Sequence, residues 1–270
     1  MRTTFQKFKA SYFLYSFKRD KVAIFSSIVL TIFLLLAATA PWVAPMDPYD
    51  AVNIDIMNSE LPPVWMEEGS SEFLLGTDNQ GRDMLSTMLY GLRTSIVIGL
   101  GAVALQGIIG VIVGLFAGYM GGKIDAVLMR LADIQFSFPY LMVAILMSAI
   151  FQVAFGLGSF ERLAVPLLIV IIGLSNWPMF ARTIRASVIG EKNKEYVEAA
   201  RVIGLPTWTI IFRHILPNSL TSVMVISTIQ VANAVMSEAA LSFLGLGMPV
   251  TRPSLGSLIR AGQEFFFSGS

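Results

Sequence analysis

The glycine-rich run from Gly118 to Lys123 is the stretch of this chain that most resembles a phosphate-binding loop. In such a loop four residues separate a first glycine from the Gly-Lys pair, and a serine or threonine follows the pair with a hydroxyl that reaches magnesium. This chain has Ala117 and Ile124 at those two positions. We therefore expect no ATP or magnesium site here, so any ATP hydrolysis coupled to this chain would take place in a separate polypeptide.

Metal and nucleophile chemistry lack the necessary side chains. His214 is the single histidine, and the chain contains no cysteine. One histidine cannot build a two-histidine metal centre, and no spacing places a serine and an acid beside it for hydrolysis. Without cysteine there can be no disulfide, thiol nucleophile or cysteine metal site. We expect a non-catalytic chain without a cofactor, and an intramembrane enzyme is the least favoured alternative.

The composition of the chain is that of membrane helices. Hydrophobic residues make up 55% of the chain and charged residues 14%, against roughly 25% charged residues in a soluble domain. Several uncharged spans approach the roughly 20 residues that a helix needs to cross a bilayer. We expect an all-α, polytopic membrane helix bundle with five visible spans, at residues 22–46, 94–120, 134–160, 163–181 and 215–237.

The charges indicate how these spans are oriented. Most of the 19 basic residues lie in the leader 1–21, the connection after the second span and the segment 182–217, whereas residues 47–83 carry nine acids against Arg82 alone. Basic loops stay in the cytoplasm, so we expect a cytoplasmic N-terminus with an amphipathic leader, a first membrane helix at 22–46 and an extracytoplasmic segment at 47–93. We expect an interfacial helix from Arg82 to Arg93 in that outer segment, and a core domain at 94–270.

Residues 195–217 form the longest charged, helix-forming stretch between two spans. Glu195 to Ile203 is predicted to be a short helix, which Gly204 ends in the left-handed conformation. Pro206 suits the first turn of a second helix. Ala199 and Ala200 are small enough for a partner to approach closely, so the segment 182–217 is predicted to be a docking loop; an amphipathic loop on the membrane surface is the alternative.

This loop resembles the one with which permease subunits of ATP-binding-cassette importers contact their ATPases. The family pattern is Glu-Ala-Ala, three residues, Gly, nine residues, an aliphatic residue, one further residue and Leu-Pro. The matching residues are Glu198, Ala199, Ala200, Gly204, Leu216 and Pro217. His214 stands at the aliphatic position, with Ile215 beside it. The resemblance implies that the matching residues, together with Leu205, couple the chain to an ATPase through cytoplasmic coupling helices.

A second resemblance lies between Leu75 and Ser95. It is similar to the outer signature of the dipeptide, oligopeptide and nickel branch of these permeases: Leu-Gly-Thr-Asp, two residues, Gly-Arg-Asp and a later Gly-x-Arg. The run from Ala239 to Gly247 extends the similarity. Physically, Asp78 to Gly81 is predicted to be a turn, and its acids lack the alternating spacing of a calcium loop.

The resemblance implies a six-span permease subunit in the bacterial inner membrane that imports peptides. The implied partners are a second permease subunit, two ATP-binding subunits that hold ATP and magnesium, an extracytoplasmic solute-binding protein and membrane lipid, with no nucleic acid. Nickel chelates, haem or oligosaccharides are alternative substrates. A secondary transporter or channel is the rival from another class, and it would need ionisable groups near the midplane that the spans lack.

The fifth span carries a polar stripe that we place on the translocation path. Its members fall within about a 90° arc at 100° per residue, and they are Ser219, Ser222, Gln230, Asn233 and Ser237. Polar side chains in hydrocarbon face protein or water, so hydrogen bonding between helices remains an equal alternative. Glu238 is predicted to lie near the outer mouth, where it would gate the path, touch substrate or, as we favour, pair with Arg252 or Arg260.

Three further expectations concern packing and the end of the chain. Gly110, Gly114 and Gly118 share one face of the second span, which favours close helix packing within this subunit over a partner contact. Asp133 is predicted to pair with Arg130, one turn away. The segment 245–263 contains two prolines and four glycines, so we expect no sixth membrane helix there. We expect such a helix to begin near Phe265 and the natural protein to continue inward, leaving a groove one helix wide beside the bundle.

Overall fold

The computed structural model describes residues 12–50, 52 and 54–268, and the chain divides into two compact units, residues 1–93 and 94–270. Helices dominate both units; among the described residues the β-type pairing recorded is an isolated bridge between Thr77 and Asp83. Within the described residues, four helices are long and apolar enough to cross a membrane, and a bent helix pair raises that number to five if it is counted as one span. The expected all-α membrane bundle is therefore confirmed.

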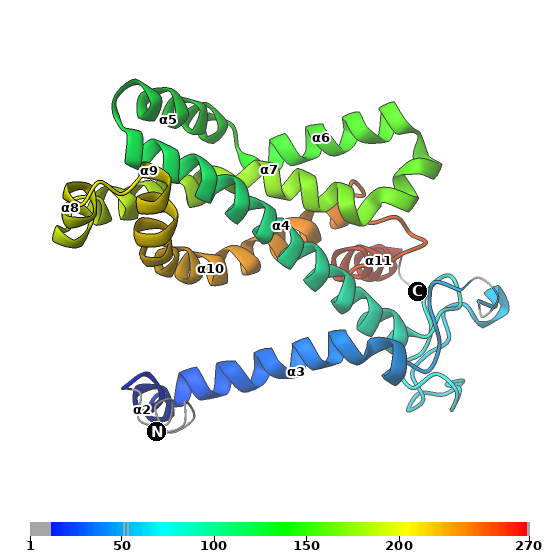
Figure 1. Ribbon diagram of the computed structural model, residues 1–270. Helices are drawn as coiled ribbons and strands as arrows, with labels where there is room; N and C mark the ends of the chain where they lie inside the picture. Colours follow the sequence, from blue (N-terminus) through cyan, green and yellow to red (C-terminus); the bar gives the residue numbers. More distant parts are fainter. Residues whose placement is uncertain (1–11, 51, 53, 269–270) are drawn as a thin grey trace. The chain divides into compact units, whose positions relative to one another are not determined.

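The first unit begins with α2 (Tyr12–Arg19) and α3 (Lys21–Val43), which are drawn in blue in Figure 1. Asp20 separates them and caps α3, because its carboxylate accepts hydrogen bonds from the backbone N–H groups of Val22 and Ala23. The first predicted span is confirmed as a helix. Most of the leader predicted to be amphipathic, residues 1–11, lies outside the described residues.

The outer segment of the first unit folds around Asp78 and Arg82. One carboxylate oxygen of Asp78 accepts the backbone N–H groups of Gln80 and Arg82, and the other accepts Arg82 Nε at 2.7 Å. Both side chains are only 5% exposed, a burial that an acid tolerates when it is paired. The predicted turn is confirmed, since Gly81 N–H donates to the Asp78 carbonyl at 3.0 Å. The residues of the outer signature thus hold this segment in its fold.

The helix α4 (Met84–Met120) runs without a break through the predicted interfacial helix and the second span. Residues 84–93 are helical, as expected, but they form one unbroken helix with the second span and not a separate element. Nothing between Met84 and Thr94 stops a helix, since Gly91 alone only weakens one. At 1.5 Å per residue this helix is about 55 Å long, which exceeds the roughly 30 Å of a bilayer core.

The predicted third span is broken in the structure. Its first residues belong to α5 (Gly122–Ser137), and the remainder forms α6 (Tyr140–Phe155), with a bend of 83° between the two helices. Pro139 explains the break, because a proline disfavours helical geometry at the residue before it, here Phe138. A turn at Gly156, with φ +74°, then leads into α7.

The core of the second unit is built on α7 (Leu157–Glu191), against which α5, α6 and α10 pack. Figure 1 shows α6 and α7 side by side. The glycine stripe of α4 also faces α7: a Cβ at Gly110 would lie 2.3 Å from Phe180 Cβ, and one at Gly114 would lie 2.4 Å from the Ala181 carbonyl oxygen. The two backbones meet there, which confirms the expectation that the stripe packs within this subunit.

The chain ends in α11 (Leu255–Ser268), which packs on α10 (Leu216–Phe243). With 14 residues, α11 is not among the candidate membrane spans of the described chain. The helix begins at Leu255, directly after the Pro253-Ser254 pair, so the expectation that a new helix starts near Phe265 is wrong. Within the second unit, α11 lies at the opposite end from α8 and α9 (Figure 1).

Candidate coupling loop and translocation site

The predicted docking loop starts later than expected, because α7 continues to Glu191 and makes the first ten residues of the segment 182–217 helical. The helix α8 (Glu195–Val202) follows. Gly204 ends it with φ +82°. Its N–H donates to the Arg201 carbonyl, and Leu205 N–H donates to the Ala200 carbonyl. These two bonds form the Schellman arrangement, so the predicted left-handed end is confirmed.

The second half of the loop is a short helical stretch that joins α10. It comprises α9 (Thr207–Thr209) and the π-helix η2 (Ile210–Ile215), and Pro206 stands directly before α9 rather than in its first turn. A π-helix holds one extra residue in its turn, and His214 lies within this stretch. Ile215 is fully buried, whereas His214 is half-buried. The side chain that packs into the buried interior here is therefore Ile215, the neighbour of the residue at the aliphatic position.

A buried cluster fixes the loop to the long helices. It combines four groups: Val197 and Ala200 of α8; Ile210, Ile211 and Ile215 of η2; Leu115 of α4; and Ile184 and Val188 of α7. Leu205 and Leu216 pack against this cluster from its edge. Because close-packed interiors transmit displacement, a force on α8 would reach α4 and α7 directly.

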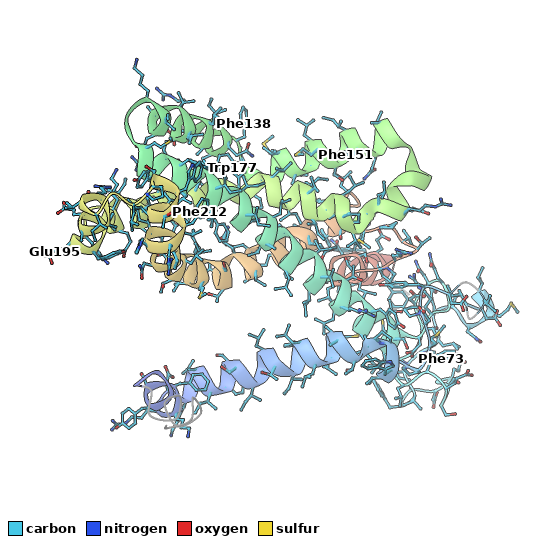
Figure 2. All side chains as sticks on the ribbon, in the orientation of Figure 1. Phe73, Phe138, Phe151, Trp177, Glu195 and Phe212 are labelled. Atoms are coloured by element: carbon cyan, nitrogen blue, oxygen red, sulfur yellow. The ribbon has the colours of Figure 1, made fainter. Side chains whose placement is uncertain are left out.

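The opposite face of α8 is open. Glu198 and Ala199 are exposed, and the apolar side chains of Val202 and Ile203 are 88% and 77% exposed. Glu195, the first residue of this helix, lies at the edge of the second unit (Figure 2). Trp208 stacks on Phe212 with 5.6 Å between ring centroids, and both rings are largely exposed. An apolar tip beside a carboxylate is a suitable contact surface for another protein. Sequence reasoning missed Val202 and Ile203, although their position just before Gly204 marks them as the tip.

Polar contacts brace the ends of the loop. The Tyr196 hydroxyl donates to Glu191 Oε2 at 2.5 Å and accepts from Asn218 Nδ2 at 3.2 Å. Burial, and then the hydrogen bond to Glu191, raises the pKa of Tyr196, so its phenol stays protonated and able to donate. Asn218 Nδ2 also donates to the His214 carbonyl at 2.7 Å. These bonds join the end of α7 to the start of α10.

Two ion pairs connect α5 with α7. Asp133 pairs with Arg182 at 2.7 Å, so the expectation that it pairs with Arg130 is wrong. A residue one turn away on the same helix competes poorly with one on the helix that α5 packs against. Asp125 pairs with Arg185 through both carboxylate oxygens, at 2.5 and 2.6 Å. Such two-armed pairs are the stronger kind.

The polar stripe of α10 does not share one environment. Ser219, Gln230 and Ser237 are buried in this subunit, Ser222 is half-buried and Asn233 is exposed. Gln230 Nε2 donates to Gln106 Oε1 of α4 at 3.4 Å, and Ser237 donates to the Asn233 carbonyl at 2.6 Å. Hydrogen bonding between helices therefore explains part of the stripe, and Asn233 is the member most open to a solute or a partner.

Glu238 is fully buried and its carboxylate is held by two serines. Ser95 of α4 and Ser242 of α10 each donate to it at 2.6 Å. The expected pairing with Arg252 or Arg260 is wrong: Arg260 pairs with Glu264, and its guanidinium lies against Gly245. An arginine on the exposed side of α11 does not reach an acid enclosed between helices. Sequence reasoning missed Ser95 and Ser242, and the four-residue spacing from Glu238 to Ser242 was a signal for the latter.

Helices long and apolar enough to cross a membrane, together with a packed loop that exposes a Glu-Ala face, are the features expected of a permease subunit. The chain belongs to the family described as the binding-protein-dependent transport system inner membrane component, whose pattern matches residues 110–270. Residues 10–63 match the N-terminal transmembrane domain of oligopeptide transport permease C. The family assignment made from the coupling loop and the outer signature is thereby confirmed.

Individual relatives agree with this assignment. The chain is 34% identical over 250 residues to the di/tripeptide transport system permease protein DppC of Pseudomonas aeruginosa, covering 93% of this chain and 78% of that protein. It is 35% identical to the oligopeptide transport system permease protein OppC of Bacillus subtilis, covering 91% and 74%. It is 36% identical to the glutathione transport system permease protein GsiD of Pectobacterium atrosepticum, covering 92% and 76%.

Proposed function

We propose that this chain is one of two permease subunits in an ATP-driven importer that passes di- or oligopeptides from an external binding protein into the cytoplasm. The observation that carries the proposal is the docking loop, residues 182–217. One face of its helix α8 packs into the buried cluster, and the other face is exposed. The names of the relatives, which refer to di- and tripeptides, oligopeptides and glutathione, support a peptide substrate.

The arrangement suits mechanical work rather than chemistry. An ATPase that contacts Glu198, Ala199 and the apolar tip at Val202 and Ile203 would move α8 as a rigid lever. The buried cluster at Ile210 and Ile215 would pass that motion to α4, α7 and α10. ATP and magnesium would be bound by two partner ATPase subunits, and this subunit would make or break no bond in the substrate.

The charge distribution indicates how the chain is oriented in the membrane. The loop and the N-terminus would face the cytoplasm of a bacterium, with the chain in its inner membrane, because basic loops remain inside. The acidic outer segment, residues 47–83, would face the binding protein. A second permease subunit would supply the other wall of the pathway.

Purification from the native membrane tests this function. The tagged chain should bring with it a second permease and ATP-binding subunits, and the reconstituted complex with its binding protein should accumulate a labelled peptide only when ATP is present. Uptake of nickel chelates, haem or oligosaccharides in place of peptides would contradict the peptide substrate but keep the importer. A chain that purifies alone and transports along an ion gradient would contradict the importer.

A further inference from the structure

Three side-chain amides form a chain across the second unit, from α7 through α4 to α10. Gln106 Nε2 of α4 donates to the Ile172 carbonyl of α7 at 3.1 Å. Gln106 Oε1 accepts from Gln230 Nε2 of α10 at 3.4 Å, and Gln230 Oε1 accepts from Asn233 Nδ2 at 2.8 Å. We call Gln106, Gln230 and Asn233 the amide relay.

The amide relay has a direction. Each amide donates through its nitrogen toward α7, and the oxygens of Gln106 and Gln230 each accept from the next member. Gln106 and Gln230 are 1% and 5% exposed, so both are held in place inside the subunit. The direction fixes the carboxamide of Asn233 with its nitrogen turned inward. In the part of the chain that the structure describes, no donor reaches Asn233 Oδ1, and the side chain is exposed.

The side chains around Asn233 indicate what its Oδ1 atom faces. Its neighbours on the exposed side of α10 are apolar, with Ile229 60% and Met236 69% exposed. Asn233 lies about 15 Å from the outer end of α10 at 1.5 Å per residue, within the span. A free amide oxygen is costly against lipid and marks a surface that meets water, protein or solute. Methionine adapts its shape to different apolar groups, which suits a surface that passes varied side chains.

We propose that the amide relay presents Asn233 Oδ1 as a hydrogen-bond acceptor for an N–H donor of the transported solute, an inference that rests on the proposed function. In a peptide this donor is either a backbone amide or the α-ammonium group. Asn233 is then the contact residue, and Gln106, remote from the solute, is a positioning residue that acts through Gln230.

The test uses the complete importer in proteoliposomes with its binding protein and radiolabelled trialanine. We expect Asn233→Leu to lower the uptake rate roughly three- to tenfold, the effect of losing one neutral hydrogen bond. Met224→Leu, at a methionine of α10 that is 69% exposed on the opposite side of the helix from Asn233, is the control and should leave uptake unchanged. Equal losses in the two variants would overturn the proposal, because the effect would then belong to the surface and not to the amide.

A double-mutant cycle tests the positioning role of Gln106. If Gln106 acts through Asn233, the double variant Gln106→Leu/Asn233→Leu should lose no more uptake than Asn233→Leu alone. Additive losses would overturn the relay.

Accessibility provides a readout that does not depend on transport. The chain has no cysteine, so Asn233→Cys and Ala234→Cys can be compared in the assembled importer with a membrane-impermeant maleimide. Ala234 is 1% exposed, and we expect labelling at 233 and none at 234. Protection of 233 in both the nucleotide-free and the ATP-bound state would overturn this inference alone. Failure of the wild-type complex to take up trialanine would instead remove the proposed function.

Discussion

Ser95 and Glu238 are 143 positions apart in the sequence, yet the Ser95 hydroxyl donates to Glu238 Oε2 at 2.6 Å. The same hydroxyl accepts from the Leu255 N–H at 3.3 Å, at the first residue of α11. Ser242 repeats the pattern: it donates to Glu238 Oε1 and accepts from the Met248 N–H at 3.0 Å. One buried carboxylate therefore holds the segment between α10 and α11 onto α4 and α10 through two serines.

This relationship predicts a stability defect for Glu238→Leu. The substitution leaves two buried hydroxyls without their acceptor, and a buried donor left unsatisfied costs roughly 1–3 kcal/mol. We expect a lower Tm of the purified subunit in detergent and faster proteolysis between residues 244 and 254. Glu264→Leu, which removes an exposed partner of Arg260, is the control and should leave both unchanged. A Glu238→Leu protein as stable as wild type would show that the serines find other partners.

The contact between α4 and α7 gives a second prediction. Gly114→Ala would place its Cβ 2.4 Å from the Ala181 carbonyl oxygen, which belongs to backbone and cannot turn aside. Overpacking of this kind costs about 1–3 kcal/mol, so we expect reduced thermal stability of the subunit. At Gly107 the nearest atom to a new Cβ is Phe180 Cε1 at 3.9 Å. Gly107→Ala should therefore be neutral or stabilising, and similar Tm values for the two variants would contradict the close helix contact.

These contacts show where sequence reasoning reaches and where it stops. Composition and spacing predicted the membrane helices, the turn at Asp78 and the end of α8 at Gly204, because each depends on neighbouring residues alone. Pro139 was available as a signal for the break in the third span and was overlooked. The partners of Glu238 and Asp133 could not be read from spacing, because which helices pack together decides them.

The docking loop, residues 182–217, was likewise predicted only in part. The sequence predicted the docking loop from its pattern and the small side chains at Ala199 and Ala200. It did not predict the π-helix at Ile210–Ile215, which depends on how η2 meets the buried cluster. For the same reason, the burial of Gln230 beside the exposure of Asn233 on one predicted stripe had to come from the structure.

A third prediction concerns the apolar tip of α8. Replacing Val202 and Ile203 together by serine removes exposed apolar surface without disturbing the core, so we expect the subunit to keep its Tm but to lose the proposed ATPase partners on purification. Apolar side chains at the centre of an interface commonly contribute 1 kcal/mol or more each. Ile124→Ser, at a 44% exposed isoleucine of α5, is the control and should retain the partners. Loss of partners in both variants, or in neither, would show that the apolar tip of α8 does not bind the ATPase specifically.

The fourth prediction separates backbone conformation from space at Gly204. A Cβ at Gly204 and one at Gly190 both meet nothing within 4 Å, but only Gly204 has a positive φ, of +82°. A β-branched residue resists that conformation, so Gly204→Val should distort the end of α8 and displace its tip. We expect peptide-stimulated ATP hydrolysis to fall at least tenfold while the protein still inserts into the membrane. Gly190→Val adds the same side chain within α7, where φ is ordinary, and should keep most of the stimulation. Normal stimulation in the Gly204→Val complex would mean that the geometry of α8 does not couple this subunit to ATP hydrolysis.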